Sequence, residues 1–289
     1  MTHRLRLQGV TLCCVDTRHP DLAWHALALC LGHGEFDDVV FIGPEGWHPP
    51  RELHPAIRLV AIPTLSGIDA YSEFMLKRLG AYVHTAHALV IQWDGFILNP
   101  GLWRPEFLQF DYIGAPWYHG GHPGMVGNGG FSLRSKRLLD ALAKLGPPSG
   151  EPEDVVICTT LRKQLEQEHG IRFAPLDLAQ AFACEYGPWR QAFGFHGMHN
   201  FAHVMTTPNL HDWLAIAPND ILISQHTRRL IKELMRSGRT MTAMQLIFQR
   251  SRSIGWTTDQ CALLLRTLFR WRPQITITGQ KPTDQHQTK

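Results

Sequence analysis

Short apolar runs alternate with helical patterns at the start of the chain. The runs at residues 9–16, 38–43 and 57–62 are rich in β-prone side chains, which is typical of strands buried on both faces of a parallel sheet. Residues 20–31 fit a helix and separate the first two runs. The order strand, helix, strand predicts the beginning of a parallel α/β sheet.

A fourth predicted strand carries a carboxylate at its end, as the first one does. Helical spacing over residues 71–85 leads into the apolar run 88–95, which contains Asp94, whereas the first run ends at Asp16. Ligands of open α/β sheets bind outside the carboxyl ends of the strands, where we expect both acids and Thr17 to lie. A turn at the end of the strand would explain Asp16 equally well.

The α/β pattern continues to about residue 200. Ser135 precedes a helical pattern and is a good N-cap residue. Another helix begins near Pro152 and has Glu153 and Asp154 in its first turn. In this part we expect strands over 126–135 and 171–174, and helices over 136–145, 152–169 and 176–184.

Beyond residue 207 the pattern changes to helices with Arg-rich faces. The predicted helices span about 221–236, 240–252 and 257–271. Residues 1–210 hold 16 Lys and Arg against 20 Asp and Glu, a formal charge of −4, whereas residues 211–272 hold 10 against 4, a charge of +6. The chain therefore divides into an α/β domain, a basic helical region and a polar tail that we expect to be disordered: 1–206, 207–272 and 273–289.

Composition excludes several classes of protein. With 44% hydrophobic and 18% charged residues, the chain of 289 residues is predicted to be globular rather than disordered. Its six cysteines include no C-x-x-C pair, which argues against a zinc ribbon or a disulfide framework. No apolar run approaches the roughly 20 residues that cross a bilayer, and no secretory signal is recognisable at the start, so we expect a cytoplasmic protein.

The common glycine-dependent nucleotide motifs are missing from the sequence. Neither G-x-x-x-x-G-K-[ST] nor a G-x-G-x-x-G after the first strand is present, which argues against a P-loop enzyme and an ordinary dinucleotide dehydrogenase. Glycines cluster instead at Gly127, Gly129 and Gly130, where the backbone can approach a ligand closely and Asn128 offers amide donors. The alternative for this segment is a plain hairpin turn.

Two further places carry candidate chemistry. His196 lies between Gly194 and Gly197 in an aromatic segment, a setting that fixes its side chain, whereas most other histidines are expected on the surface or in the core. Glu153 and Asp154 lie in the first turn of a predicted helix, where their negative charge interacts favourably with the positive end of the helix dipole. A carboxylate there can also act as general base for a hydroxyl nucleophile.

Seven segments together resemble an uncharacterised bacterial and fungal glycosyltransferase-like family, similar in layout to nucleotide-sugar-dependent transferases of the GT-A fold. The resemblance covers about residues 9–200, with the segments VTLCCVDT, LVIQWDGFILNP, FDYIGAPW, VGNGGFSLRS, PEDVVIC, IRFAP and FGFHG. It implies a GT-A-like, Rossmann-like α/β fold: a mixed sheet flanked by helices, here with a C-terminal helical appendage.

The resemblance also implies a metal site. In GT-A enzymes an Asp-x-Asp motif at a strand end holds Mn²⁺ or Mg²⁺ against the donor diphosphate, and Gln92, Trp93 and Asp94 occupy that place here. The first acid is missing, so only Asp94 matches as a ligand. His196 is similar to the late histidine that completes the metal or diphosphate site. Because Mg²⁺ prefers oxygen ligands, a site that includes His196 favours Mn²⁺.

The remaining matches concern the sugar and the acceptor. The Gly127–Gly130 segment resembles the glycine-rich segment beside the donor sugar. Glu153 and Asp154 resemble the element that supplies the base of inverting transferases. We therefore expect a transferase that moves a sugar from a nucleoside-diphosphate sugar, with UDP-sugars favoured, to a hydroxyl of a glycan, a lipid-linked carrier or a protein.

Two other functions stay open. Loss of the first Asp fits a catalytically weak protein that binds a nucleotide sugar or a glycan without turnover. A nucleotidyltransferase is the third hypothesis, although the expected glycine-rich loop with Lys or Arg after the first strand is absent.

The basic helical region suggests a further partner. Its basic residues are spaced so that they can gather on one side of a helix and its following turn: Arg228, Arg229, Lys232, Arg236 and Arg239. Such a face can contact anionic lipid at the inner face of the membrane, where each basic residue contributes about 1 kcal/mol. A solvated face is the alternative, and nucleic acid is not expected because no recognition motif accompanies the charge.

Overall fold

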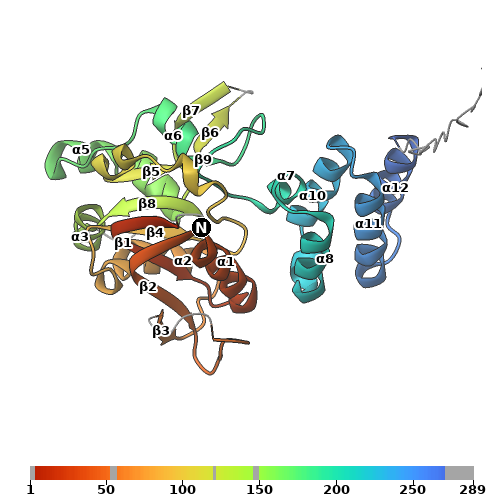
Figure 1. The fold of residues 1–289 in the computed structure, drawn as a ribbon, viewed down its shortest axis with the longest axis horizontal. Helices are drawn as coiled ribbons and strands as arrows, with labels where there is room; N and C mark the ends of the chain where they lie inside the picture. Colours follow the sequence, from red (N-terminus) through yellow and green to blue (C-terminus); the bar gives the residue numbers. More distant parts are fainter. Residues whose placement is uncertain (1–3, 53–56, 120–121, 146–149, 271–289) are drawn as a thin grey trace, which may run out of the picture.

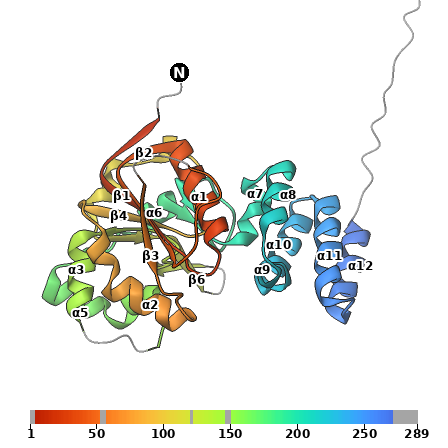
Figure 2. The ribbon, with the colours of Figure 1, turned by 90° about the horizontal axis from the view of Figure 1, so that it is seen from below.

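The computed structural model describes residues 4–52, 57–119, 122–145 and 150–270, so the tail expected over 273–289 lies outside it. An α/β body and a helical segment lie side by side (Figures 1 and 2). The helical segment begins at α7 (Phe201–Val204), which packs against a later helix of the same segment. Within the described ranges, no helix combines the length and the apolar character that a membrane span needs.

A mixed sheet forms the centre of the body. In the described part of the chain it has six strands, in the spatial order β3 (Ile57–Ile62), β2 (Gly34–Pro44), β1 (Leu5–Val15), β4 (His87–Ile91), β8 (Phe131–Ser135) and β5 (Tyr112–Gly114). Neighbours from β3 to β4 are parallel, whereas β8 is antiparallel to both β4 and β5. The predicted parallel beginning is confirmed, and the sheet becomes mixed only at β8.

Helices cover both faces of this sheet. Leu12 and Cys14 of β1 pack in the same apolar cluster as α1 (Pro20–His33), whereas Cys13 and Val15 pack with α2 (Ile68–Lys77) on the opposite face. A strand that is buried on both faces needs apolar side chains at consecutive positions. This explains why the first strand shows no alternation of polar and apolar residues.

The second half of the body is less regular than the sequence predicts. Its helices and short strand pairs are β6 (Pro116–His119), β7 (His122–Val126), α3 (Lys136–Lys144), α4 (Glu153–Val155), a π-helical turn (Val156–Thr160), α5 (Arg162–His169), α6 (Leu176–Phe182), β9 (Ala183–Cys184) and β10 (Gly194–Phe195). Short 3₁₀ turns span Leu79–Tyr82, Pro100–Leu102, Pro105–Gln109 and Met198–Asn200. Ser135 caps α3 as expected, because its side chain accepts a hydrogen bond from the Leu138 amide at 3.0 Å.

Several predicted elements of the body differ from the structure; the helix expected over 176–184, for example, ends at Phe182 and is followed by β9. The predicted helix over 152–169 is interrupted where the Leu161 amide donates to the carbonyl of Val156 at 2.8 Å, five residues earlier. The predicted strand over 171–174 is wrong, since only Phe173 forms a bridge, to Tyr112, and β5 is too short to pair a longer segment. The predicted strand over 126–135 is divided into the end of β7 and β8 by the glycine segment.

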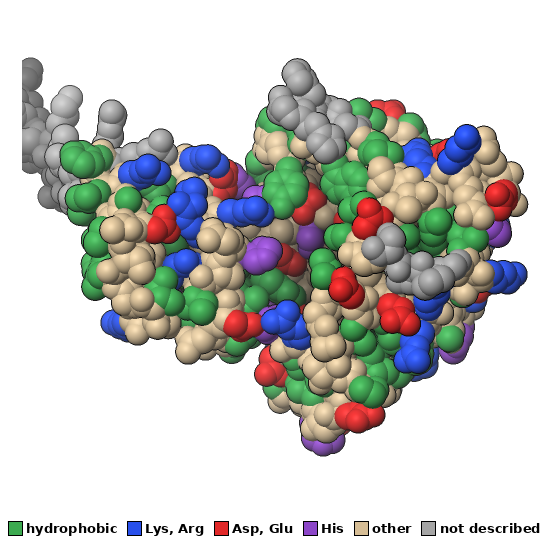
Figure 3. Space-filling view, turned by 180° about the vertical axis from the view of Figure 1, so that it is seen from behind, with side chains coloured by type: hydrophobic (Ala, Val, Ile, Leu, Met, Phe, Trp, Pro, Cys, Tyr) green, Lys and Arg blue, Asp and Glu red, His purple; other side chains and the backbone are tan. Residues whose placement is uncertain are grey.

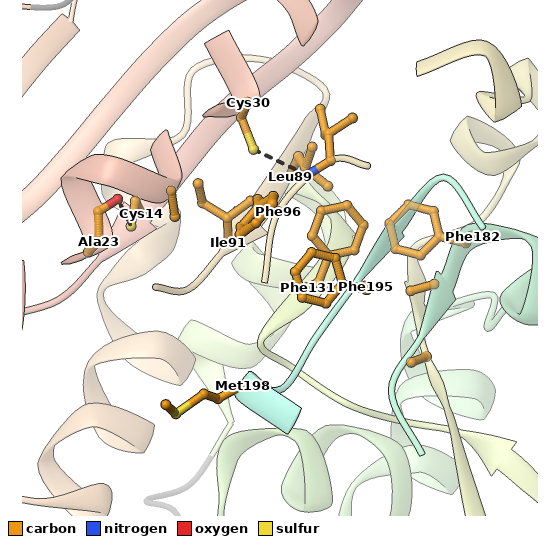
Figure 4. Packing of buried hydrophobic residues seen from close by; sticks show 14 of the residues in the cluster. Cys14, Ala23, Cys30, Leu89, Ile91, Phe96, Phe131, Phe182, Phe195 and Met198 are labelled. Atoms are coloured by element: carbon orange, nitrogen blue, oxygen red, sulfur yellow. Dashed lines mark hydrogen bonds between the residues drawn. The ribbon is translucent and has the colours of Figure 1, made fainter. Parts of the chain in front are cut away.

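Aromatic rings and cysteines fill the core between the sheet and the later elements. Figure 4 shows Phe96, Phe131 and Phe195 gathered there, and the rings of Phe96 and Phe195 meet edge to face with centroids 4.7 Å apart. Cys30 accepts a hydrogen bond from the Ile97 amide at 3.4 Å. The cysteines are free, as predicted, and all except the exposed Cys261 are buried.

Helices make up the described part of the chain after Met198. They are α7 (Phe201–Val204), α8 (Thr207–Ile216), α9 (Asn219–Ile223), α10 (Gln225–Arg236), α11 (Thr240–Ile254) and α12 (Thr258–Arg270). The predicted helix over 221–236 is divided at Ser224, whose hydroxyl caps α10 by accepting from the amides of His226 and Thr227. The two later helices form close to their predicted bounds.

Internal contacts use four of the five basic residues expected on one face of this segment. Arg229 donates to the Tyr186 hydroxyl at 3.1 Å, and Arg236 donates to Glu233 at 2.9 Å. Arg228 binds the carboxylate of Asp259 with three hydrogen bonds of 2.6 to 3.0 Å, which joins α10 to α12. Arg239 donates to the carbonyls of Ala202 and Met205 at 3.1 and 2.7 Å. Membrane contact stays a prediction, and fewer basic residues than expected are free to make it.

Candidate functional site

A pocket of about 440 Å³ opens where β1 and β4 end, between the body and the helical segment. Asp16, Thr17, Gln92 and Trp93 line it, so the structure brings these predicted site residues together. We call this the edge pocket. Figure 3 shows the molecule hollowed between the helical segment, on the left, and the body, with histidine and acidic side chains inside the hollow.

The turn after β1 shapes one wall of the edge pocket. Asp16 Oδ1 accepts hydrogen bonds from the amides of Arg18 and His19 at 2.8 and 2.7 Å, and Thr17 Oγ1 accepts from the Leu65 amide at 2.9 Å. Burial raises the pKa of Asp16 although both amide bonds oppose the shift. Asp16 therefore both fixes the turn and contributes a partly buried carboxyl group to the pocket.

Asp94 and His196 meet just beyond β4. His196 Nε2 lies 3.3 Å from Asp94 Oδ1 and 3.1 Å from Gln92 Oε1. Burial alone would raise the pKa of the Asp94 carboxyl, but the charge and hydrogen bond of His196 lower it. Burial alone would lower the pKa of His196, but Asp94 and Glu185 raise it well above its usual value. His196 thus lies between two carboxylates, which favour the protonated form of its ring.

Glu185 is a site residue that the sequence analysis missed. Its Oε1 lies 3.0 Å from Nδ1 of His196, on the side of the ring opposite Asp94. The side chain is buried, and its Oε2 has no hydrogen-bond partner among the residues that the structure describes. Glu185 follows β9, so the rule that led to Asp16 and Asp94 applies to it, but a strand of two residues leaves no readable pattern.

The glycine segment touches the site through its backbone. A Cβ on Gly130 would lie 2.1 Å from His196 Nε2, and a Cβ on Gly129 would lie 2.1 Å from Glu153 Oε1. Asn128 has a φ of 51° and places its amide nitrogen 2.9 Å from Nδ1 of His196. The hairpin alternative is not what forms, since β7 pairs with β6 and β8 pairs with β4 and β5. These glycines allow a close approach that other residues would prevent.

Gly127 also allows a close approach of the backbone, in this case to Trp117 rather than to His196. A Cβ at this position would lie 2.1 Å from the indole of Trp117. The segment therefore runs between Trp117, His196 and Glu153 with its backbone in contact with all three side chains. Substitution of any of these glycines displaces a neighbouring side chain.

Glu153 is held by a buried partner. Its Oε1 accepts a hydrogen bond from Arg134 at 2.9 Å, and the Arg134 side chain has no exposed surface. Arg134 also donates to Ser132 Oγ at 3.0 Å and to the Gly129 carbonyl at 3.1 Å. A buried guanidinium needs an opposite charge, so neutralising Arg134 is a sufficient reason for Glu153 to be acidic.

Asp154 is the more available of the two neighbouring acids. Its Oδ2 accepts a hydrogen bond from the Gly129 amide at 3.2 Å, and its Oδ1 accepts from the Val155 amide at 2.9 Å. The side chain is half-buried, and burial together with the charge of Glu153 raises its pKa. A raised pKa brings a carboxyl group closer to the range in which a general base works best.

The comparisons with known proteins cover the middle of the chain. Residues 56–196 are similar to a family described as a protein of unknown function, DUF5672. No curated protein matches the chain. The matched residues include Asp94, His196, Asp154 and the glycine segment, but neither Asp16 nor the helical segment.

A divalent ion beside Asp94 would have few protein ligands. The spacings of 3.3 and 3.1 Å that His196 Nε2 makes with Asp94 and Gln92 are those of hydrogen bonds, so an ion would have to take the place of the proton between them. The described residues contain no group of three or more His, Cys, Asp or Glu side chains around a common metal position. Diphosphate and water would have to complete the coordination, as is usual for Mg²⁺ sites.

Proposed function

We propose that the chain is a glycosyltransferase of GT-A-like architecture that moves a sugar from a nucleoside-diphosphate sugar, with UDP-sugars favoured, to a hydroxyl acceptor. The observation that carries the proposal is the contact between Asp94 and His196 beside the edge pocket. Ligands of α/β sheets bind at this edge, and the pocket is large enough for a nucleotide-sized ligand.

The donor end of the site supports this assignment. Asp94 and His196 would hold Mn²⁺, with the Gln92 carbonyl close by, and the ion would supply positive charge to the departing diphosphate. Glu185 orients the ring, since its carboxylate lies 3.0 Å from Nδ1 and leaves Nε2 directed at Asp94 and Gln92. Carboxylates play the same part behind histidine ligands in many metal sites.

The acceptor end of the site is assigned to Asp154. Gly129 and Gly130 link the two ends, because Gly129 donates to Asp154 and Gly130 lies against His196. Asp154 would take the proton from the acceptor hydroxyl as it attacks the anomeric carbon. A base on the acceptor side with no covalent intermediate leads to inversion at that carbon. Glu153 is less suited to this task, because its charge is already paired with Arg134.

A binding protein on the same architecture is the second candidate. Gln92 stands where the resemblance requires an acid, and its amide donates to the Tyr71 hydroxyl at 2.9 Å while its carbonyl faces His196. A neutral residue so placed weakens metal binding. Such a protein would bind the donor but release no diphosphate.

A thermal-shift panel tests the proposal at the level of binding. UDP, GDP, CDP and their sugars are each added with and without Mn²⁺ to the wild type and to Asp94→Asn. A ligand at about 100 times its dissociation constant adds about 2.7 kcal/mol of stability, and we expect this with one nucleotide and Mn²⁺ in the wild type. Asp94→Asn should lose the metal-dependent part. Stabilisation by none of these nucleotides would contradict the proposal.

A further inference from the structure

Side chains of the helical segment complete the edge pocket. Asp220 and Ile221 of α9, together with Ser224 and His226 at the start of α10, face the residues of β1 and β4 across it. These four residues lie outside the part of the chain that matches a family.

The helical segment is anchored where it meets the pocket. Trp213 of α8 is buried and stacks on Trp93, with ring centroids 5.6 Å apart and planes inclined by 26°. The His226 ring meets Trp93 edge to face, with ring centroids 6.3 Å apart. Trp93 is the residue before Asp94, so the position of α8 and α10 is tied directly to the proposed catalytic strand end.

Basic side chains line the pocket from both sides, with two carboxylates among them. Arg18 and His19 belong to the body and His226 belongs to the helical segment, whereas Asp16 and Asp220 are the carboxylates. The N-cap residues of α1, α2 and α10 also line the pocket: His19, Gly67 and Ser224. Helix N-termini favour anions, so Arg18 and these helix starts can bind an anionic ligand such as a diphosphate where Asp220 gives way to it.

Asp220 contacts the two basic side chains that such a ligand would bind on the body side of the pocket. Its Oδ2 lies 3.3 Å from Nε2 of His19 and 3.7 Å from the guanidinium of Arg18. The Asp220 and Arg18 side chains are half or more exposed, so this link is weak enough to be exchanged for another anion.

We propose that the helical segment is the second wall of the donor site. Asp220 contacts Arg18 and His19, the diphosphate of the donor takes its place there, and His226 contacts the same diphosphate from the opposite side. The inference rests on the proposed function for the identity of the donor. It assigns to residues 219–226 a part in selecting the anionic half of that donor.

The sharpest test is a substitution that should tighten ligand binding. A variant that fails to fold would bind more weakly, so tighter binding cannot result from a folding defect. Calorimetry measures the affinity of UDP, with GDP, CDP and inorganic pyrophosphate in parallel. Asp220→Asn removes the competing carboxylate, and we expect it to bind the favoured diphosphate about three- to fivefold more tightly. Asp212→Asn makes the same charge change on the exposed surface of α8, away from the pocket, and should have no effect.

His226→Ala is the complementary variant. We expect diphosphate affinity to fall about tenfold, since a hydrogen bond to the ligand is lost. His211→Ala is its control, because His211 is exposed on α8 and bonds to Gln245 at 2.9 Å rather than to pocket residues. The difference between the two histidine variants measures the contribution of the second wall.

The outcomes separate this inference from the proposed function. If the wild type binds UDP or another nucleoside diphosphate but neither Asp220→Asn nor His226→Ala changes the affinity, the second wall is refuted and the proposed function survives. If only pyrophosphate binds and Asp220→Asn tightens it, the anion site stands and the nucleotide-sugar donor is refuted. If nothing binds to any variant, both are refuted.

Discussion

Gly130→Ala is the most local perturbation of the proposed site, because it adds one methyl group where His196 lies. A Cβ on Gly130 would come within 2.1 Å of His196 Nε2, whereas ordinary van der Waals contact begins at 3.4 Å. The imidazole or the backbone must therefore move by about 1.3 Å, the difference between these distances. The bonds of His196 to Asp94 and Gln92, at 3.3 and 3.1 Å, are already long and would break.

We expect turnover of Gly130→Ala to fall about 100-fold, the loss that a misplacement of about 1 Å produces in enzymes. The free energy of unfolding should fall by about 1–3 kcal/mol, as in other overpacked cores. Release of nucleoside diphosphate from a UDP-sugar measures the first change, and urea unfolding measures the second. Gly101→Ala is the control, because a Cβ there meets nothing within 4 Å. Wild-type turnover in folded Gly130→Ala would refute the role given to the Asp94–His196 contact.

Three further substitutions test other parts of the account. Asp154→Asn should lower turnover by at least about 100-fold with donor affinity little changed. In the wild type, turnover should fall on the acid side of its pH profile at a pH above the ordinary Asp range, since burial raises the pKa of Asp154 and the base acts in its ionised form. An unchanged rate in the variant, or an acid-side fall within the ordinary Asp range, would exclude Asp154 as the base. Glu153→Gln should lower the free energy of unfolding by about 3–5 kcal/mol in urea, because it leaves Arg134 buried without a charged partner; a stable variant with little turnover would instead make Glu153 the base. The hydrogen bond to Arg58 holds the pKa of Asp38 below its usual value, so the ionised Asp38 stabilises the folded protein near neutral pH, and this stability is lost as the pH falls through the pKa of the folded state. Asp38→Asn should therefore be less stable than the wild type near neutral pH, with a smaller difference at low pH. Identical pH profiles of unfolding would contradict this.

Local signals in the sequence were sufficient for the regular part of the sheet. The first strand is recognisable because Leu12 to Val15 are buried on both faces, and this demands apolar residues at each position. The same strand ends pointed to Asp16 and Asp94, since the carboxyl ends of parallel strands share one edge. The prediction succeeded where a residue's environment follows from its own neighbours in the chain.

Tertiary contacts explain what the sequence could not show. Arg134 and Glu153 form a buried ion pair across 19 positions, and neither residue alone differs from an ordinary surface charge in the sequence. Glu185 reaches His196 from a strand of two residues, which is too short for a periodic signal. Asp220 enters the edge pocket through the packing of the helical segment on the body, of which the stacking of Trp213 on Trp93 is one contact.

The most direct test of the central claim is release of nucleoside diphosphate from the nucleotide sugar that the protein binds, with Mn²⁺ and an excess of acceptor hydroxyls. The account predicts steady release by the wild type and by Gly101→Ala, and a loss of at least about 100-fold in both Asp94→Asn and Asp154→Asn. Tight binding of the nucleotide sugar with no release by the wild type would contradict transfer, and would identify the edge pocket as a binding site only.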